Sequence, residues 1–150
     1  MTIEEAIQTS AQLTDQRKTV INLLYTASWI NEVINKAIKP FGISLQQFNV
    51  LRILKGQKQY PINLSDINKR MVTKMSNTTR LIDKLLAKAY VDRVVCPTNR
   101  RKIEVRITDQ GLDFLKTIEP VITEAEEYIT TQLNSNELES LNTLLNNLRH

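Results

Sequence analysis

The spacing of hydrophobic residues predicts a chain built mainly from helices. Between residues 10 and 38, apolar side chains recur three and four positions apart, the spacing of a long helix with a heptad-like seam. Pro40 and Gly42 follow this stretch and should end the helix. The seam consists of Val20, Leu23, Ala27, Ile30, Ile34 and Ala37. Similar spacing predicts further helices at about residues 44–56, 63–71, 73 or 76 to 89, 109–133 and 134–148.

Polar residues that can cap helices mark most of the predicted starts. A capping side chain accepts a hydrogen bond from a free backbone N–H of the first turn, and Glu or Gln three positions later can complete a capping box. For the helix that ends near Ala89, Thr73 and Ser76 are both candidate caps, and the choice stays open. The other predicted caps are Ser44 with Gln47, Asn63 with Asp66, Thr108, and Asn134 with Glu137.

Two segments alternate between apolar and polar residues, which is typical of strands. Residues 97–101 join them as the tip of a hairpin, and Ile62 is a candidate short edge strand. The hairpin follows a helix, a turn at residues 72–76 and a second helix, and this order is typical of DNA-binding proteins. The alternating positions are Val91, Arg93 and Val95 in one strand and Ile103, Val105 and Ile107 in the other.

Charge is distributed unevenly along the chain. The formal net charge of +4 says little by itself. Residues 52–106, however, hold 14 of the 20 Lys and Arg residues and 4 of the 16 Asp and Glu residues, so this segment carries +10. The remaining residues carry −6. This segregation indicates that one region of the protein meets a polyanion and the rest does not.

Composition narrows the class of protein further. With 150 residues and 41% hydrophobic content, the chain is expected to form a single domain over residues 1–150. No apolar run approaches the roughly 18 residues needed to cross a membrane, and the first residues are acidic and polar, so we expect a cytoplasmic protein without a membrane partner. The chain has one cysteine, Cys96, one histidine, His150, and no catalytic or phosphate-loop motif. We therefore expect no catalytic residue, metal, cofactor or enzymatic activity.

The helix after the turn presents polar side chains suited to reading DNA. Arg80 can donate two hydrogen bonds to a guanine edge, and Asn77 can pair with adenine. Ser76 and Thr79 can reach phosphates or bases, and Lys84 lies one turn farther on, where a helix leaving the groove passes phosphates. The alternative is a basic helix face that contacts only solvent. The adjoining turn and basic hairpin favour DNA binding.

The hairpin tip carries three consecutive cations, Arg100, Arg101 and Lys102. A basic turn often serves only solubility. Three cations in a tight turn repel one another, however, and a polyanionic partner accounts for them better. An arginine extended from a hairpin fits the narrow minor groove, where the negative potential is enhanced.

These features resemble the MarR family of winged-helix transcription regulators. The run SNTTRLIDKL (Ser76–Leu85) resembles the family's recognition helix, and NRRKIEVRIT followed by Gly111 resembles its wing. The resemblance implies a mainly α fold with a winged helix-turn-helix DNA-binding lobe at about residues 44–108, including a two-stranded β wing. The N- and C-terminal helices, at about residues 10–38 and 109–150, would form a dimerisation lobe.

The resemblance also assigns roles within the wing. Arg101 occupies the place of the arginine that enters the minor groove. Asn99 replaces the acidic residue that usually helps to hold this arginine, so Arg101 is expected to be less rigidly aimed. Ala89 replaces the usual glycine before the first wing strand, which suggests a different helix end.

By the same resemblance, the protein would be a homodimeric repressor that binds a pseudo-palindromic operator in double-stranded DNA. A small aromatic or phenolic effector would release it, and Tyr25, Trp29 and Phe48 are candidate pocket residues, although such aromatics are more often core residues. The leucine stripe of residues 138–148 independently indicates a dimer, because it needs an apolar partner. Packing of the terminal helices within one chain is the alternative. For the whole protein, the alternative is a winged-helix module that binds another protein rather than specific DNA.

Cys96 raises the hypothesis of redox sensing. Nearby Arg93 and Arg100 could lower the pKa of its thiol and so favour the reactive thiolate. The competing interpretation is that a lone cysteine in a strand acts as a small apolar residue.

Overall fold

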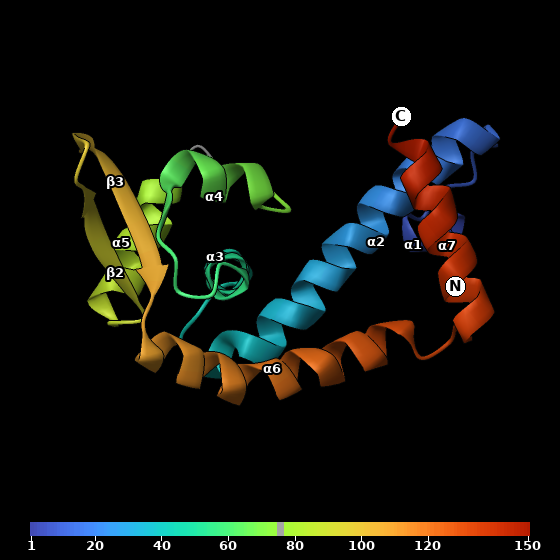
Figure 1. Ribbon diagram of the computed structural model, residues 1–150. Coiled ribbons are helices and arrows are strands. Elements are labelled where there is room, and N and C mark those ends of the chain that lie inside the picture. The colour runs from blue at the N-terminus through green and yellow to red at the C-terminus, as the bar shows by residue number, and fades with distance from the viewer. Residues whose placement is uncertain (75–76) are drawn as a thin grey trace.

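The protein is mostly helical, with one small sheet (Figure 1). The structure, a computed structural model, describes residues 1–74 and 77–150, and at Arg100 it describes the backbone alone. This architecture confirms the predicted mainly α fold. In chain order the elements are α1 (Ile3–Ala6), α2 (Asp15–Ile38), the 3₁₀ helix η1 (Lys39–Phe41), α3 (Leu45–Gly56), β1 (Ile62–Asn63), α4 (Leu64–Arg70), α5 (Thr78–Ala87), β2 (Val91–Cys96), β3 (Asn99–Ile107), α6 (Asp109–Thr130) and α7 (Ser135–Leu148).

The predicted caps begin the helices as expected. In α3, Ser44 Oγ accepts the N–H of Gln47 at 3.2 Å, and the Gln47 side chain accepts the N–H of Ser44 at 2.9 Å. Asn134 and Glu137 form the same reciprocal pair at α7. Asn63 and Thr108 cap α4 and α6. Each pair satisfies backbone N–H groups that have no partner within their helix.

Other boundaries differ from prediction. The long helix begins at Asp15 rather than near residue 10, because Thr14 takes an extended conformation and caps it by accepting the N–H of Arg17 at 3.3 Å. The short helix α1 precedes it and was not predicted. At α5 the capping residue is Asn77, which makes no side-chain capping hydrogen bond. Thr73 therefore does not cap α5, and Ser76 lies outside the described residues.

The backbone at the end of α5 shows how Ala89 takes a position where glycine was expected. The N–H of Tyr90 donates to the carbonyl of Leu85, and the N–H of Ala89 donates to that of Leu86. This is a Schellman ending, which requires a left-handed residue, and Ala89 has φ +59°. Ala89 therefore adopts a left-handed conformation that glycine adopts more readily.

The sheet has three antiparallel strands in the order β1-β3-β2. Ile62 lies opposite Val105, so the predicted edge strand exists and is two residues long. The hairpin of β2 and β3 is the wing. Its base is buried, with Val91, Val105 and Ile107 at 1% exposure or less.

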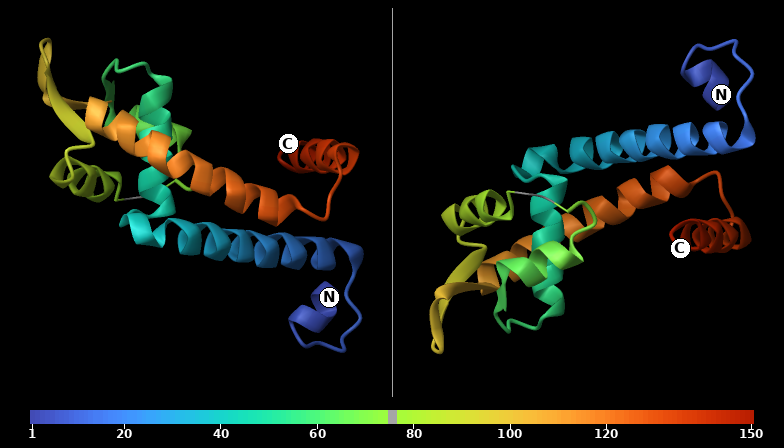
Figure 2. Two further views of the ribbon diagram at one scale, coloured as in Figure 1. Left: turned by 90° about the horizontal axis from the view of Figure 1, so that it is seen from below. Right: turned by 90° about the horizontal axis from the view of Figure 1, so that it is seen from above.

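The core lies between α3, α4, α5, the sheet and the first half of α6. Helices α2 and α6 pack together beneath α3 and diverge away from it (Figure 1). Among residues of α2 only Ile38 is buried, and no residue of α7 is buried; the structure describes both helices completely. Figure 2 shows α7 on the opposite side of α6 from α2.

Gly111 allows the start of α6 to approach the end of α5. A methyl group at this position would overlap the backbone carbonyl of Tyr90 and crowd Ile107. We predict that Gly111→Ala lowers the free energy of unfolding by about 1–3 kcal/mol in chemical denaturation followed by circular dichroism. Gly56→Ala is the matched control, because nothing lies within 4 Å of its added methyl. That control should leave stability unchanged or raise it slightly, and equal losses in both variants would contradict this account.

Candidate nucleic-acid interface

Burial of one face of α5 determines which side chains the helix presents outward. Thr78, Leu81, Ile82 and Leu85 face the core, with exposures of 9% or less. The predicted reading residues on the opposite face are all exposed: Asn77, Thr79, Arg80 and Lys84. Asn77 lies just before the first turn of the helix rather than within it. Ser76 lies outside the described residues.

Intramolecular ion pairs divide the basic residues of this lobe into two groups. Arg93 pairs with Asp83 of α5 at 2.6 Å, and Arg106 lies 3.9 Å from Asp92. These arginines hold the wing to α5 and β2 to β3. Four of the cations predicted to contact DNA, Arg80, Lys84, Arg101 and Lys102, form no ion pair with any carboxylate that the structure describes. Their charges are available to an external anion.

Lys88 does not continue the row of outward cations on α5. Its ammonium group donates to the carbonyl of Gly42, and the side chain is half-buried. Gly42 has φ +67° and marks the end of the α2–η1 segment. Lys88 therefore ties α5 to this joint and does not extend outward as Lys84 does.

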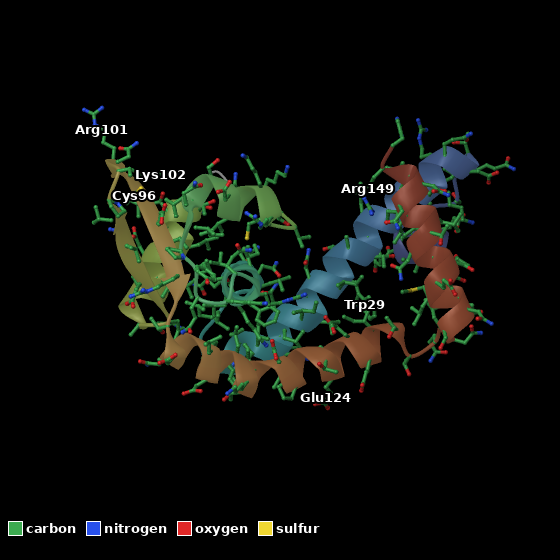
Figure 3. The ribbon with its side chains drawn as sticks, in the orientation of Figure 1. Trp29, Cys96, Arg101, Lys102, Glu124 and Arg149 are labelled. Atoms are coloured by element: carbon green, nitrogen blue, oxygen red, sulfur yellow. The ribbon has the colours of Figure 1, made fainter. Side chains whose placement is uncertain are left out.

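The three cations of the wing occupy an irregular part of β3. Val95 lies opposite Ile103, whereas the next residue, Cys96, lies opposite Asn99. Residues 100–102 therefore have no partner on β2 and form a bulge at the tip. The Asn99 side chain accepts the backbone N–H of Arg101 at 3.1 Å, so Asn99 shapes the bulge although it cannot form an ion pair. The Arg101 side chain extends beyond the tip (Figure 3).

The predicted alternation along the wing holds only at its base. Val95 is 67% exposed and Ile103 is 40% exposed, whereas Val91, Val105 and Ile107 are buried. The hairpin extends past the helices that cover its base (Figure 1), so these two side chains are covered less than those at the base. The sequence alone did not predict this exposed pair.

Cys96 is buried beside the tip. Its Sγ lies 3.3 Å from the Thr98 hydroxyl, and this hydrogen bond is the main cause that lowers the pKa of the thiol, with backbone groups of Thr98 and Asn99 adding to it. Arg93 does not supply the effect, since its guanidinium is paired with Asp83.

The candidate effector residues do not come together as predicted. Tyr25 and Trp29 line a small cavity of about 150 Å³ with residues of α1. Trp29 lies between α2 and α6 (Figure 3), with its ring centroid 6.3 Å from that of Tyr128. Phe48 is 2% exposed in the core, where Arg52 covers its ring, and it does not line that cavity.

The described part of the chain has neither a membrane-spanning helix nor a cluster of metal ligands. None of its helices is long and apolar enough to cross a membrane. Its His, Cys, Asp and Glu residues form no group of three or more that could hold a metal ion.

Comparison with known proteins gives a consistent result. The MarR family model matches residues 43–103. A MarR transcription factor from Planctomyces limnophilus is 30% identical, with a TM-score of 0.71, and the alignment covers 92% of this chain and 98% of that one. The HTH-type transcriptional regulator TcaR of Staphylococcus aureus is 28% identical over 96% of this chain and 91% of its own length. A mutant MarR from E. coli, solved in complex with operator DNA, has a TM-score of 0.79 at 21% identity, covering 92% of this chain and 99% of that one.

The order of the helices and the three-stranded sheet with its wing lead to the same conclusion as these similarities over nearly the whole chain. The chain belongs to the MarR family and is a DNA-binding transcription regulator rather than an enzyme.

Proposed function

We propose that the protein is a homodimeric repressor that binds a pseudo-palindromic operator. The observation that carries this proposal is the set of unpaired cations on the outward face of α5 and on the wing. Residues 44–108 act as the DNA-binding lobe, and residues 10–38 and 109–150 act as the dimerisation lobe. Acting on chromosomal DNA places the protein in the cytoplasm.

In this proposal α5 lies in the major groove. Arg80 donates two hydrogen bonds to a guanine, and Asn77 and Thr79 contact neighbouring bases or phosphates, as would Ser76. Lys84, one turn farther along the exposed face, contacts a phosphate. The wing carries Arg101 into the adjacent minor groove, while Arg100 and Lys102 neutralise phosphates beside it.

Separate substitutions on α5 test this assignment. We predict that Arg80→Ala reduces discrimination at one base position of each half-site by about 1–3 kcal/mol. Lys84→Ala should weaken all sequences alike and lower the salt dependence of binding by about one counterion. Titration of a randomised site library, built on the DNA upstream of the protein's own gene, measures both effects. Uniform loss in both variants would show that the reading face is placed wrongly.

The same titrations rank the wing residues. Arg101→Ala should weaken binding more than Arg100→Ala or Lys102→Ala, with the largest loss at sites flanked by A·T pairs. A larger loss for Arg100→Ala would move the minor-groove contact by one residue. Repression is tested with a reporter gene placed downstream of the bound site. Expression of the reporter should rise in cells that lack the protein.

The exposed leucines of α7 support the dimer. Leu141, Leu144 and Leu148 are 42%, 65% and 52% exposed on one face of a helix that buries none of its own residues. The alternative is packing of α7 on α2 within one chain, but Figure 2 shows these two helices standing apart. Val20 and Leu24 of α2 add exposed apolar surface. Two-fold pairing would place two recognition helices about one DNA turn apart.

A charge-insertion pair tests this interface. We predict that Leu141→Glu with Leu144→Glu converts the dimer to a monomer in sedimentation and abolishes operator binding, because the charges would be buried against apolar surface. Asn136→Glu with Thr143→Glu is the matched control, since these residues lie on the opposite face of α7. A dimer that survives the leucine substitutions would refute the assignment.

We also propose that a small aromatic or phenolic effector binds at the cavity beside Tyr25 and Trp29. Partly exposed rings next to a cavity between α1 and α2 support this site. Trp29 is the single tryptophan, so its fluorescence reports binding directly. Benzoate or phenol should change this fluorescence and release operator DNA, and Tyr25→Ala should weaken both effects. If benzoate or phenol released the operator DNA completely without changing the fluorescence of Trp29, the effector would bind elsewhere.

The competing function is a winged-helix module that binds another protein. Absence of specific binding to the upstream DNA, with the fold intact, would favour it.

A further inference from the structure

The wing carries an apolar pair within an otherwise basic surface. Val95 of β2 and Ile103 of β3 lie directly opposite each other in the ladder. Their exposures of 67% and 40% contrast with the buried pair Val91 and Ile107 at the base of the same hairpin. Single exposed apolar residues are ordinary on protein surfaces, but two that face each other form a continuous aliphatic surface next to the bulge of cations.

The position of this pair relative to α5 follows from one contact. Arg93, two residues before Val95 on the same face of β2, is held by Asp83 of α5 at 2.6 Å. Two strand residues advance about 6.6 Å, and one helical turn advances about 5.4 Å. Because β2 runs back along α5 after the turn that joins them, Val95 lies farther from Arg93 in the direction of the start of α5. The aliphatic pair therefore lies toward the end of α5 that carries Thr79 and Arg80.

Cations border the other side of the pair. Ile103 lines a hollow of about 340 Å³ together with Arg101, Lys102 and the residues Asn63, Leu64 and Ser65 at the start of α4. Neither Arg101 nor Lys102 forms an ion pair within the described chain. The surface thus presents aliphatic carbon flanked by positive charge.

We propose that Val95 and Ile103 pack against deoxyribose rings of the DNA strand that separates the groove read by α5 from the groove entered by Arg101. A DNA strand presents C–H groups of the sugars between anionic phosphates, which complements an aliphatic surface bordered by Arg101 and Lys102. The inference rests on the proposed DNA-binding mode and adds an apolar contact to it. This contact releases no counterions and is independent of base sequence, unlike the contacts of Lys84 and Arg80.

Threonine substitutions test the contact in the full-length protein. Val95→Thr and Ile103→Thr keep a β-branched side chain suited to a strand and remove apolar contact area. Loss of about one buried methyl group predicts roughly fourfold weaker operator binding for each variant. The slope of log K against log salt should stay at the wild-type value. Arg101→Ala is the contrast, because losing a phosphate-proximal cation should flatten that slope.

Val94→Thr is the matched control. Val94 precedes Val95 on the same strand, lies opposite Glu104 and points to the other face of the wing. It receives the same chemical change and should bind like wild type. Thermal melts followed by circular dichroism show whether each variant is folded. A threonine variant that fails to fold is replaced by a leucine substitution at the same position. Leucine keeps the apolar contact, so this variant should bind DNA.

A direct readout completes the test. In methyl-labelled protein bound to operator DNA, the Ile103 and Val95 methyl groups should show nuclear Overhauser effects to deoxyribose protons. Wild-type affinity in both threonine variants, a flattened salt slope, or methyl signals unmoved by DNA would each overturn the inference. These outcomes differ from failure of the proposed function, in which the wild-type protein itself would not bind the operator.

Discussion

Burial of the apolar face of α5 is the constraint on which the proposed DNA-binding surface depends. Leu85 is fully buried and Ile82 nearly so, while Lys84 lies between them in sequence and is exposed. Rotating the helix would expose leucine side chains worth about 1.5–3 kcal/mol each and bury an unpaired charge. The same packing that stabilises the lobe therefore holds Arg80 and Lys84 outward.

The wing follows a different rule, because only its base is part of the core. Val105 and Ile107 anchor it, and β1 adds a third strand along β3. Beyond this base, the bulge at residues 100–102 separates the three cations from the ladder. Short-range polar contacts, such as that of Asn99 with the backbone of Arg101, shape the tip in place of packing. Such a tip can adapt to a groove while its base stays fixed.

Polar contacts join the proposed DNA-binding lobe to the long helices, and three of them lie at the ends of α2, α5 and α6. The Lys88 ammonium binds the carbonyl of Gly42, the Asn35 side chain accepts the N–H of Leu45, and the Thr108 hydroxyl donates to the carbonyl of Ala89 at 2.7 Å. These contacts connect α5 and α3 to α2, and the end of α5 to the start of α6. The end of α5 is therefore tied by hydrogen bonds to the end of the α2–η1 segment and to the start of α6.

Local patterns in the sequence determined most of the secondary structure. The Ser44–Gln47 and Asn134–Glu137 caps involve residues three apart, so their hydrogen bonds depend on nothing distant. The inward and outward faces of α5 follow from helical periodicity alone. The same reasoning predicted the hairpin and the segregation of positive charge into residues 52–106, because both are properties of continuous segments.

The tertiary structure alone decided which side chains are covered, because this depends on where each segment ends relative to its neighbours. Val95 and Ile103 pair in the same ladder as the buried Val91 and Ile107, but the covering helices stop short of the tip (Figure 1) and leave both exposed. Spacing could not show that Phe48 enters the core while Trp29 lies between α2 and α6. Nor could it show that Lys88 meets Gly42, 46 positions away. Periodicity identifies the face of an element, whereas only the packed chain determines what, if anything, lies against that face.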